Sequence, residues 1–169
     1  MMSSFKNLKI GFTLIEVLIY ISLFMVVTAA SVGFLFSLDD FIYQYRIETA
    51  LYKSGTNAME QILLGVRQAE SVDLINSTFN TPAAGRLTVI NGASTTAFVL
   101  DSGVLRMELD GDDYGTVAFD GVNAEEFTVY YYTLTEGELV RVKLRLSATI
   151  NGVTKDLTLY GSSVVRGSL

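Results

Sequence analysis

The first long pattern in the chain is a hydrophobic stretch without any charged residue, Val17–Leu38. As an α-helix its 22 residues would extend over about 33 Å, the thickness of one bilayer core. Lys6 and Lys9 are the charged residues before Glu16, and the pair Asp39–Asp40 follows the stretch directly. Because positive residues are retained on the cytoplasmic side, the sequence predicts one membrane-spanning helix with its N-terminus inside and about 130 residues outside.

Beyond the hydrophobic stretch the pattern becomes amphipathic. Hydrophobic residues recur three and four positions apart, as they do on one face of a helix; they are Met59, Ile62, Leu63 and Val66. Ser54 and Gly55 weaken a helix and mark a candidate break. The segment Asp73–Pro82 is rich in Asn, Ser and Thr, so we expect the helix to end near Leu74.

The rest of the chain has the pattern of strands and turns. Leu139–Ile150 alternates hydrophobic with polar residues, and Asn151-Gly152 predicts a two-residue hairpin turn after it. The register of that hairpin places Ile150 opposite Val153 and Leu146 opposite Leu157. Five shorter segments bounded by turn residues are further candidate strands: Arg86–Ile90, Thr95–Leu100, Val104–Leu109, Gly115–Phe119 and Glu126–Thr133. A long helix followed by such strands predicts an α+β fold with the helix packed on an antiparallel sheet.

Composition removes several classes of function. The chain has 169 residues with no His and no Cys, which excludes Cys/His zinc sites, disulfide scaffolds and nucleophiles that depend on His or Cys. The formal net charge of -6 argues against a general nucleic-acid binder, so no direct nucleic-acid partner is expected.

Glu16 is the residue that an ordinary membrane anchor does not explain. A carboxylate inside an apolar helix costs about 2.5 to 3.5 kcal/mol on insertion and is usually present because a partner is supplied. A cleaved secretory signal fits poorly, since its hydrophobic region has about 7 to 15 residues, fewer than the 22 here. An uncleaved signal anchor explains the length and flanking charges but leaves Glu16 without a role.

The segment Lys9–Leu18, KIGFTLIEVL, resembles the class III signal of type IV prepilins and type II secretion pseudopilins. The resemblance implies cleavage between Gly11 and Phe12 by a prepilin peptidase, and methylation of the new amine of Phe12. It also implies that Glu16 neutralises the N-terminal amine of an adjacent subunit. A buried charge left without its partner costs several kcal/mol, which agrees with such a pairing.

The same resemblance divides the chain into four parts. They are a cleaved leader at 1–11 with its basic Lys6 and Lys9, a transmembrane and filament-core helix at 12–38, an amphipathic helix at 39–75 and an antiparallel β head at 76–169. The chain also lacks the Cys pair and the anchor proline of many major pilins. Together with similarity at residues 61–72, Leu105–Arg106 and Ser163–Arg166, these absences favour a minor pilin or a J-type minor pseudopilin.

Candidate chemistry in the head is limited. The carboxylates of Asp110, Asp112 and Asp113 form a candidate calcium loop, but an EF-hand places a bidentate acid at its twelfth position, which here is Gly121. The alternative is an acidic hairpin turn, and we expect no cofactor. Carboxylates on solvated turns, here Asp101, Glu108 and Asp120, do not predict hydrolysis, since nothing apolar surrounds them to raise a pKa. We therefore expect no enzyme activity.

Two surface patterns of the head have alternative interpretations. Tyr130–Tyr132 is either a platform for a partner or a strand with one face under the helix and the other covered by a loop. On one strand face, Arg141, Lys143 and Arg145 either meet an acidic partner or balance charges of the chain itself, with Asp156 and the pair Glu125–Glu126 as candidates.

These observations lead to one prediction and one alternative. We expect a structural subunit stored in the cytoplasmic membrane and assembled into a periplasmic or extracellular filament of a pilus or type II secretion machine. By resemblance, its partners are other pilin subunits, the prepilin peptidase, membrane lipid, an assembly platform protein and, indirectly, an assembly ATPase. The alternative is an uncleaved, signal-anchored extracytoplasmic binding module such as an adhesin or receptor head, in which Glu16 is incidental.

Overall fold

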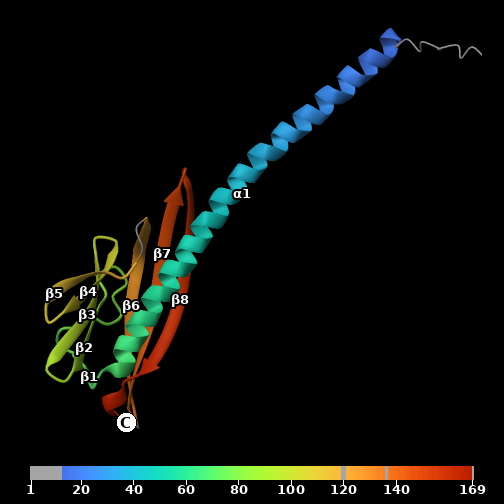
Figure 1. Ribbon diagram of the computed structural model, residues 1–169. Helices are drawn as coiled ribbons and strands as arrows, with labels where there is room; N and C mark the ends of the chain where they lie inside the picture. The colour runs from blue at the N-terminus through green and yellow to red at the C-terminus, as the bar shows by residue number, and fades with distance from the viewer. Residues whose placement is uncertain (1–12, 119–120, 136, 169) are drawn as a thin grey trace, which may run out of the picture. The chain divides into compact units, whose positions relative to one another are not determined.

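The computed structural model describes residues 13–118, 121–135 and 137–168. It contains two compact units, Met1–Ile42 and Tyr43–Leu169, and we call the second unit the head. The helix α1, Leu14–Gln68, runs through both units with 55 residues and is continuous at Ser54 and Gly55 (Figure 1). The candidate break at these two residues is therefore wrong. The predicted α+β class is confirmed, since antiparallel strands follow and pack against the helix.

The helix α1 ends at Gln68, six residues before the end that we predicted near Leu74. The chain leaves the helix because its backbone pairs with a neighbouring strand instead. Strand β1, Ser71–Val72, pairs with β2, Arg86–Asn91, and the Asp73 N–H donates to the Thr88 carbonyl at 2.9 Å. The Asp73 carboxylate then accepts the N–H groups of the two residues Ile75 and Asn76, which closes a tight turn.

The strands of the head form two antiparallel sheets rather than one. The first has the order β1-β2-β3-β4-β5 and the second the order β6-β7-β8. The remaining elements are β3 Ser94–Asp101, β4 Val104–Leu109, β5 Asp112–Thr116, β6 Val122–Leu134, β7 Gly137–Ile150, β8 Val153–Val164 and the short 3-10 helix η1 Arg166–Ser168. The alternation of hydrophobic and polar residues within a strand does not indicate to which of the two sheets that strand belongs.

The predicted strand Gly115–Phe119 is corrected to Asp112–Thr116. Asp110 and Gly111 both have positive φ values, 52° and 91°. They make a tight turn that returns the chain at once, so β5 begins at Asp112 and pairs with β4. The apolar Val117 that suggested a strand is buried after β5 ends, and Phe119 lies outside the described residues.

The hairpin of β7 and β8 has the predicted register. Ile150 lies opposite Val153 and Leu146 opposite Leu157, and no irregularity interrupts the twelve residue pairs that the described strands form. The turn residues Asn151 and Gly152 have φ values of 51° and 80°, as the Asn-Gly signal requires. Alternate residues of β7 are therefore buried, which places the apolar ones in the core and the basic ones outside.

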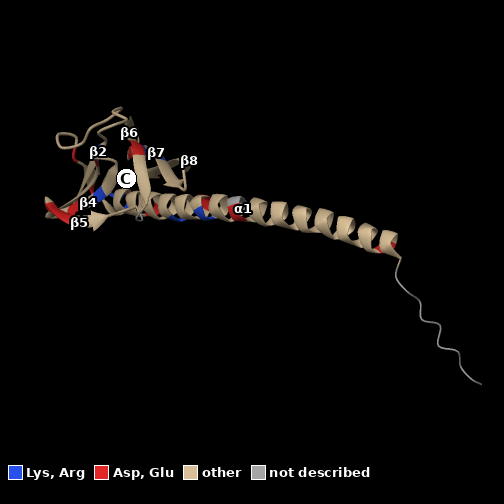
Figure 2. Ribbon diagram, turned by 90° about the horizontal axis from the view of Figure 1, so that it is seen from above, with Lys and Arg blue, Asp and Glu red and all other residues tan. Residues whose placement is uncertain are grey.

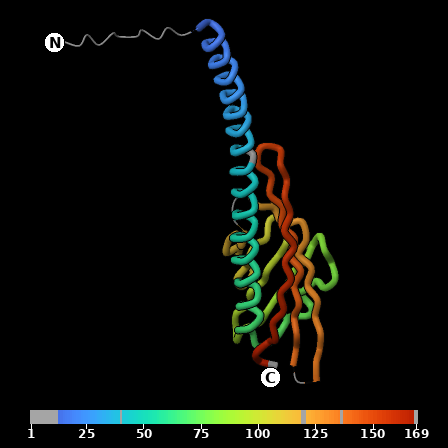
Figure 3. The backbone as a smooth tube through the Cα atoms, turned by 90° about the vertical axis from the view of Figure 1, so that its right-hand side faces the viewer, coloured from blue at the N-terminus to red at the C-terminus, as the bar shows by residue number. Residues whose placement is uncertain are grey.

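The core of the head lies between the C-terminal part of α1 and both sheets. In Figures 1 and 3 this part of the helix runs beside β7 and β8. Small residues permit the close approach: a Cβ atom added to Gly55 would lie 2.6 Å from the Leu159 side chain, and one added to Gly161 would lie 2.6 Å from the Met59 sulfur. The largest fully buried side chains include Phe98, Phe127, Ile47, Ile62 and Leu87.

A loop joins the two sheets along the outer edge of β6. The Asn80 N–H donates to the Val129 carbonyl at 3.0 Å, and the Phe127 N–H donates to the Pro82 carbonyl at 3.0 Å. Gly85 then passes so close that an added Cβ atom would lie 1.7 Å from the Phe127 carbonyl oxygen. The edge of β6 is therefore satisfied by the loop and not by another strand.

We predict that Gly85→Ala destabilises the head by about 1 to 3 kcal/mol, because the backbone of β6 or of the loop must move to admit the methyl group. The exposed neighbour Ala84 serves as the control, and Ala84→Ser is expected to change stability by less than about 0.5 kcal/mol. Thermal unfolding of the full chain in detergent, followed by circular dichroism, measures both. Equal melting temperatures for the two variants would contradict the close packing at Gly85.

Candidate functional site: the N-terminal end of the anchor helix

The predicted processing residues lie at the very start of the chain. Gly11 and Phe12, with the basic residues Lys6 and Lys9, lie outside the described residues, so their roles stay predictions. The described chain begins at Thr13, and the geometry around it concerns the other predicted site residue, Glu16.

Thr13 and Glu16 form the start of α1. The Glu16 N–H donates to the Thr13 carbonyl at 3.1 Å and lies 3.4 Å from the Thr13 hydroxyl oxygen, while the Val17 N–H donates to the same carbonyl at 3.2 Å. A Thr three residues before a Glu is the pair found in a capping box, where side-chain oxygens satisfy the first free N–H groups of a helix. Glu16 also lies at the positive end of the helix dipole, which stabilises its charge.

The Glu16 carboxylate has a hydroxyl partner. The Tyr20 hydroxyl, one turn further along α1, donates to Glu16 Oε1 at 3.4 Å. Among the ion pairs of the described residues, none involves Glu16. Glu16 can therefore still accept a cation from another molecule. The hydrophobic pattern does not indicate Tyr20 as a partner of Glu16, and the one available signal is its spacing of four residues along the helix.

Three further hydroxyls of the apolar stretch are satisfied within the helix. The hydroxyls of Ser22, Thr28 and Ser31 donate to carbonyls of Ile19, Phe24 and Val27 at 2.9, 2.8 and 2.8 Å. Such bonds let a hydroxyl enter lipid without an unpaired donor. The most apolar window of α1 has a mean hydropathy of 2.2 and is not buried by the rest of the protein, and Figure 2 shows this half of α1 almost free of charge.

The N-terminal end of the chain matches a known family motif. Residues 6–32 match the prokaryotic N-terminal methylation motif. This is the motif expected of a class III prepilin leader. The matched residues include the predicted cleavage junction and Glu16, and they extend into a helix of membrane-spanning length. Neither the curated proteins nor the solved structures yield a match to the chain.

The carboxylates that we considered for calcium are used separately in the head. Asp110 accepts the Thr95 N–H at 2.6 Å, and Asp113 pairs with the Arg106 guanidinium. Asp112 precedes Asp113 on β5, and the described residues contain no group of three carboxylates or other ligands that could hold a metal ion. The acidic turn is thus a hairpin whose charges support its own strands.

Nor are the carboxylates considered for hydrolysis brought together. Glu108 pairs with Arg86 at 2.6 Å, and Asp101 accepts the Ser102 hydroxyl at 3.0 Å. On the paired strands, Glu108 lies opposite Ala97 and Asp101 lies opposite Val104, at different ends of the ladder. Asp120 lies outside the described residues.

The basic stripe on β7 is largely balanced within the head. Lys143 pairs with Glu126 at 2.7 Å, Arg145 pairs with Asp156 at 3.0 Å, and the Arg141 guanidinium lies 5.5 Å from the centre of the Tyr160 ring. The hydrogen bond from Lys143 holds the pKa of the Glu126 carboxyl below its usual range. The interpretation that these cations balance charges of the same chain is confirmed for Lys143 and Arg145.

The tyrosine run has one face toward the protein and one toward solvent. Tyr131 is partly buried and packs on Phe79 of the preceding loop, with ring centres 5.6 Å apart, whereas Tyr132 is 46% exposed. The strand is therefore two-sided, as in the alternative to a binding platform, but the loop residue Phe79 packs on the face of Tyr131 and not on the face of Tyr132.

The Glu126–Lys143 pair predicts a pH dependence. Because folding lowers the pKa of Glu126 from its ordinary 4.5, the pair stabilises the head above that pH and loses this effect as the pH falls below it. Glu126→Gln is expected to cost about 1 kcal/mol at pH 7 and less at pH 3. Melting temperatures at the two pH values measure this, with Glu125→Gln as the control. A cost that is the same at both pH values would contradict the assignment.

Proposed function

We propose that the chain is a pilin or pseudopilin, a non-enzymatic subunit of a helical filament. The observation that supports this most is the methylation motif at residues 6–32, which continues into an uncharged helix. The pilin-like α+β head adds support, because a long helix packed on antiparallel strands is the fold that the leader implies.

The proposed contact between subunits joins two charged groups, the amine of Phe12 and the carboxylate of Glu16. Cleavage between Gly11 and Phe12 leaves a positively charged amine on Phe12, at the end of the helix that already carries the positive side of the dipole. The Glu16 carboxylate, with only a hydroxyl as its described partner at 3.4 Å, accepts that amine from a neighbouring subunit. Neither charge is tolerable alone in lipid or in an apolar filament core, so the pair sets the register of assembly.

The remaining steps of assembly depend on the anchor helix and on other proteins. Helices with small residues such as Ser22, Ser31 and Gly33 approach one another closely, so they can exchange lipid contacts for contacts with like helices. A prepilin peptidase processes the chain at the cytoplasmic face, and a platform protein with a cytoplasmic ATPase supplies the work of extraction. The head then leaves the outer side of the membrane as part of a periplasmic or extracellular filament.

Within this class we propose a minor subunit, either a minor pilin or a J-type minor pseudopilin. The chain has no cysteine for the loop-closing disulfide of many major pilins, and its anchor has no proline. Both features support a subunit outside the thick shaft of a major pilus.

The N-terminus of the protein recovered from membranes tests this proposal. We expect a mature chain that begins at N-methylated Phe12, detected by mass spectrometry of the N-terminal peptide. Glu16→Ala should leave cleavage intact and reduce incorporation into filaments by tenfold or more, since about 1.4 kcal/mol of lost pairing is a factor of ten. The control is Asp39→Asn, which removes another carboxylate of α1 and should assemble normally.

An uncleaved chain beginning at Met1 or Met2, with normal behaviour of Glu16→Ala, would contradict the proposal. It would favour the alternative, a signal-anchored binding module.

The orientation in the membrane has a separate test. Because the chain contains no cysteine, one introduced cysteine is labelled without background. The test uses cells without prepilin peptidase, so that the leader is retained. We predict that Thr135→Cys in the head reacts with a membrane-impermeant maleimide added outside the cytoplasmic membrane, whereas Ser4→Cys in the leader reacts only after permeabilisation. Labelling is read as a mass shift on a gel, and the reverse pattern would overturn the N-inside orientation.

A further inference from the structure

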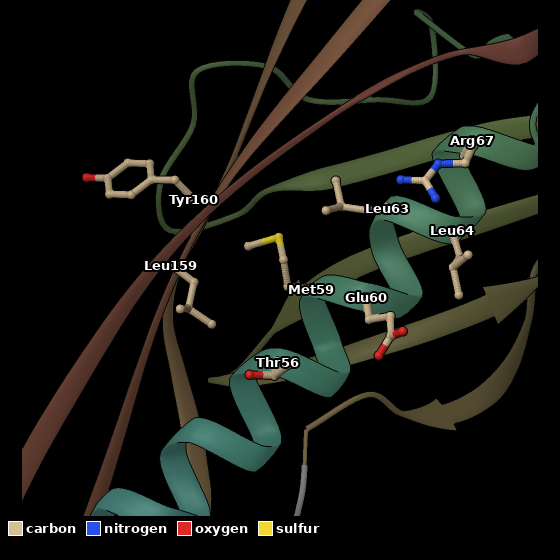
Figure 4. A pocket seen from close by; sticks show the side chains of 8 residues that line it. All are labelled: Thr56, Met59, Glu60, Leu63, Leu64, Arg67, Leu159 and Tyr160. Carbon is tan, nitrogen blue, oxygen red and sulfur yellow. The ribbon is translucent and has the colours of Figure 1, made fainter.

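A groove runs within the head between α1 and β8. It consists of two hollows of about 470 and 420 Å³ that share Arg67. We call it the α1–β8 groove and define it by Met59, Leu63 and Arg67 of α1 together with Tyr160, Ser162 and Arg166. Figure 4 shows Met59 and Leu63 extending from α1 toward the strand that carries Leu159 and Tyr160. The first hollow is lined mainly by apolar side chains, with Thr56 and Glu60 also on its lining, and both arginines line the second hollow.

The strand side of the groove is an open sheet edge. β8 is the last strand of its sheet, with β7 as its one strand partner in the described chain. The two-residue turn makes Ile150 and Val153 a hydrogen-bonded pair. From there along the hairpin, non-hydrogen-bonded and hydrogen-bonded pairs alternate. Tyr160, opposite Lys143, and Ser162 therefore direct their backbone N–H and C=O groups away from β7. The hydrogen bonds between described residues do not use these outward groups.

This edge lacks the usual protection against pairing. Natural edge strands carry charges, prolines or bulges that prevent another strand from adding. The segment Leu157–Val165 has no charged residue and no proline, and its register with β7 is uninterrupted. The open edge coincides with the groove, since Tyr160 and Ser162 line the two hollows.

The end of the groove is positively charged. Arg67 and Arg166 line the same hollow as the hydroxyl residues Ser162 and Ser163. Within the described chain neither arginine forms an ion pair, whereas Arg86, Arg106, Lys143, Arg145 and Lys155 each do. Two unpaired guanidinium groups in one hollow, on a chain of net charge -6, are complementary to a carboxylate.

We propose that the α1–β8 groove binds an extended segment of a partner protein that ends in an acidic residue. The segment pairs with the free backbone groups of Tyr160 and Ser162 and so adds a strand to β8. An apolar side chain of the segment covers Leu63, and its carboxylate binds Arg67 and Arg166. This surface belongs to the head alone, so the proposal does not depend on the role of Glu16.

A synthetic peptide provides the probe. It has about eight residues, alternating valine and threonine and ending in two glutamates, with a fluorescent label. We expect it to bind the full chain in detergent with micromolar affinity, measured by fluorescence anisotropy. The same peptide ending in two lysines should bind at least tenfold more weakly, because it meets like charges at the arginine end. Binding should slow hydrogen exchange at the amides of Tyr160 and Ser162, which reports strand addition directly.

Paired variants separate the two parts of the site. The double variant Arg67→Glu, Arg166→Glu should weaken binding by tenfold or more, while Arg46→Glu, another exposed and unpaired arginine of α1, should not. Ser162→Pro removes an outward N–H without loss of a bond to β7 and should abolish binding. Thr154→Pro removes an equivalent outward N–H near the hairpin turn, outside the segment Leu157–Val165, and should bind as the wild type does. Circular dichroism verifies that each variant is folded.

Glu16→Ala should bind the peptide normally, which separates failure of this proposal from failure of the filament proposal. Several results would overturn the groove assignment. These are no binding of the glutamate peptide at millimolar concentration, equal binding of the two peptides, or unchanged binding by Ser162→Pro. Self-association of the wild type that the double arginine variant abolishes, without peptide binding, would assign the groove to a second copy of the chain instead.

Discussion

The head depends on the close packing of one helix against two sheets. Gly55 and Gly161 let α1 lie directly on the strands, and Gly65 lets it approach Phe98 of the other sheet. Either sheet alone would expose one apolar face to water, and the helix would expose a stripe. The loop along β6 joins the sheets through backbone hydrogen bonds, so the core that α1 covers is shared between them.

The same helix meets two different surroundings along its length, and this decides how its polar groups behave. In the first part the hydroxyls of Ser22, Thr28 and Ser31 are bonded to the helix itself. Glu16 cannot be satisfied in this way, because a carboxylate needs a cation or several donors and Tyr20 offers one hydroxyl. The requirement for a partner is therefore greatest at Glu16, close to the predicted cleavage junction, and the proposed assembly of subunits depends on this requirement.

The head differs from the apolar part of α1 in where its polar and charged groups lack a partner. Several of its charges are paired, as Lys143 with Glu126 and Arg145 with Asp156 show, and one edge of the second sheet is covered by the loop. Among the described strands, β8 has an open edge, and two arginines without a described ion pair line the hollow beside it. An exposed edge and unpaired charge in one place make this the part of the head most suited to contact with another protein.

Local patterns in the sequence determined the anchor helix and the register of the β7–β8 hairpin. These follow from hydrophobic periodicity and turn chemistry, which act between residues close in the chain. The roles expected of Gly11, Phe12 and Glu16 rest on the resemblance to a prepilin leader and stay predictions. Only the tertiary structure decided that α1 ends at Gln68, that the strands divide into two sheets, that the acidic turn holds no group of metal ligands within the described residues, and that Arg67 and Arg166 line one hollow. Each of these depends on backbone pairing or packing between segments far apart in sequence, and no local pattern records which distant segment a strand edge or helix face will meet.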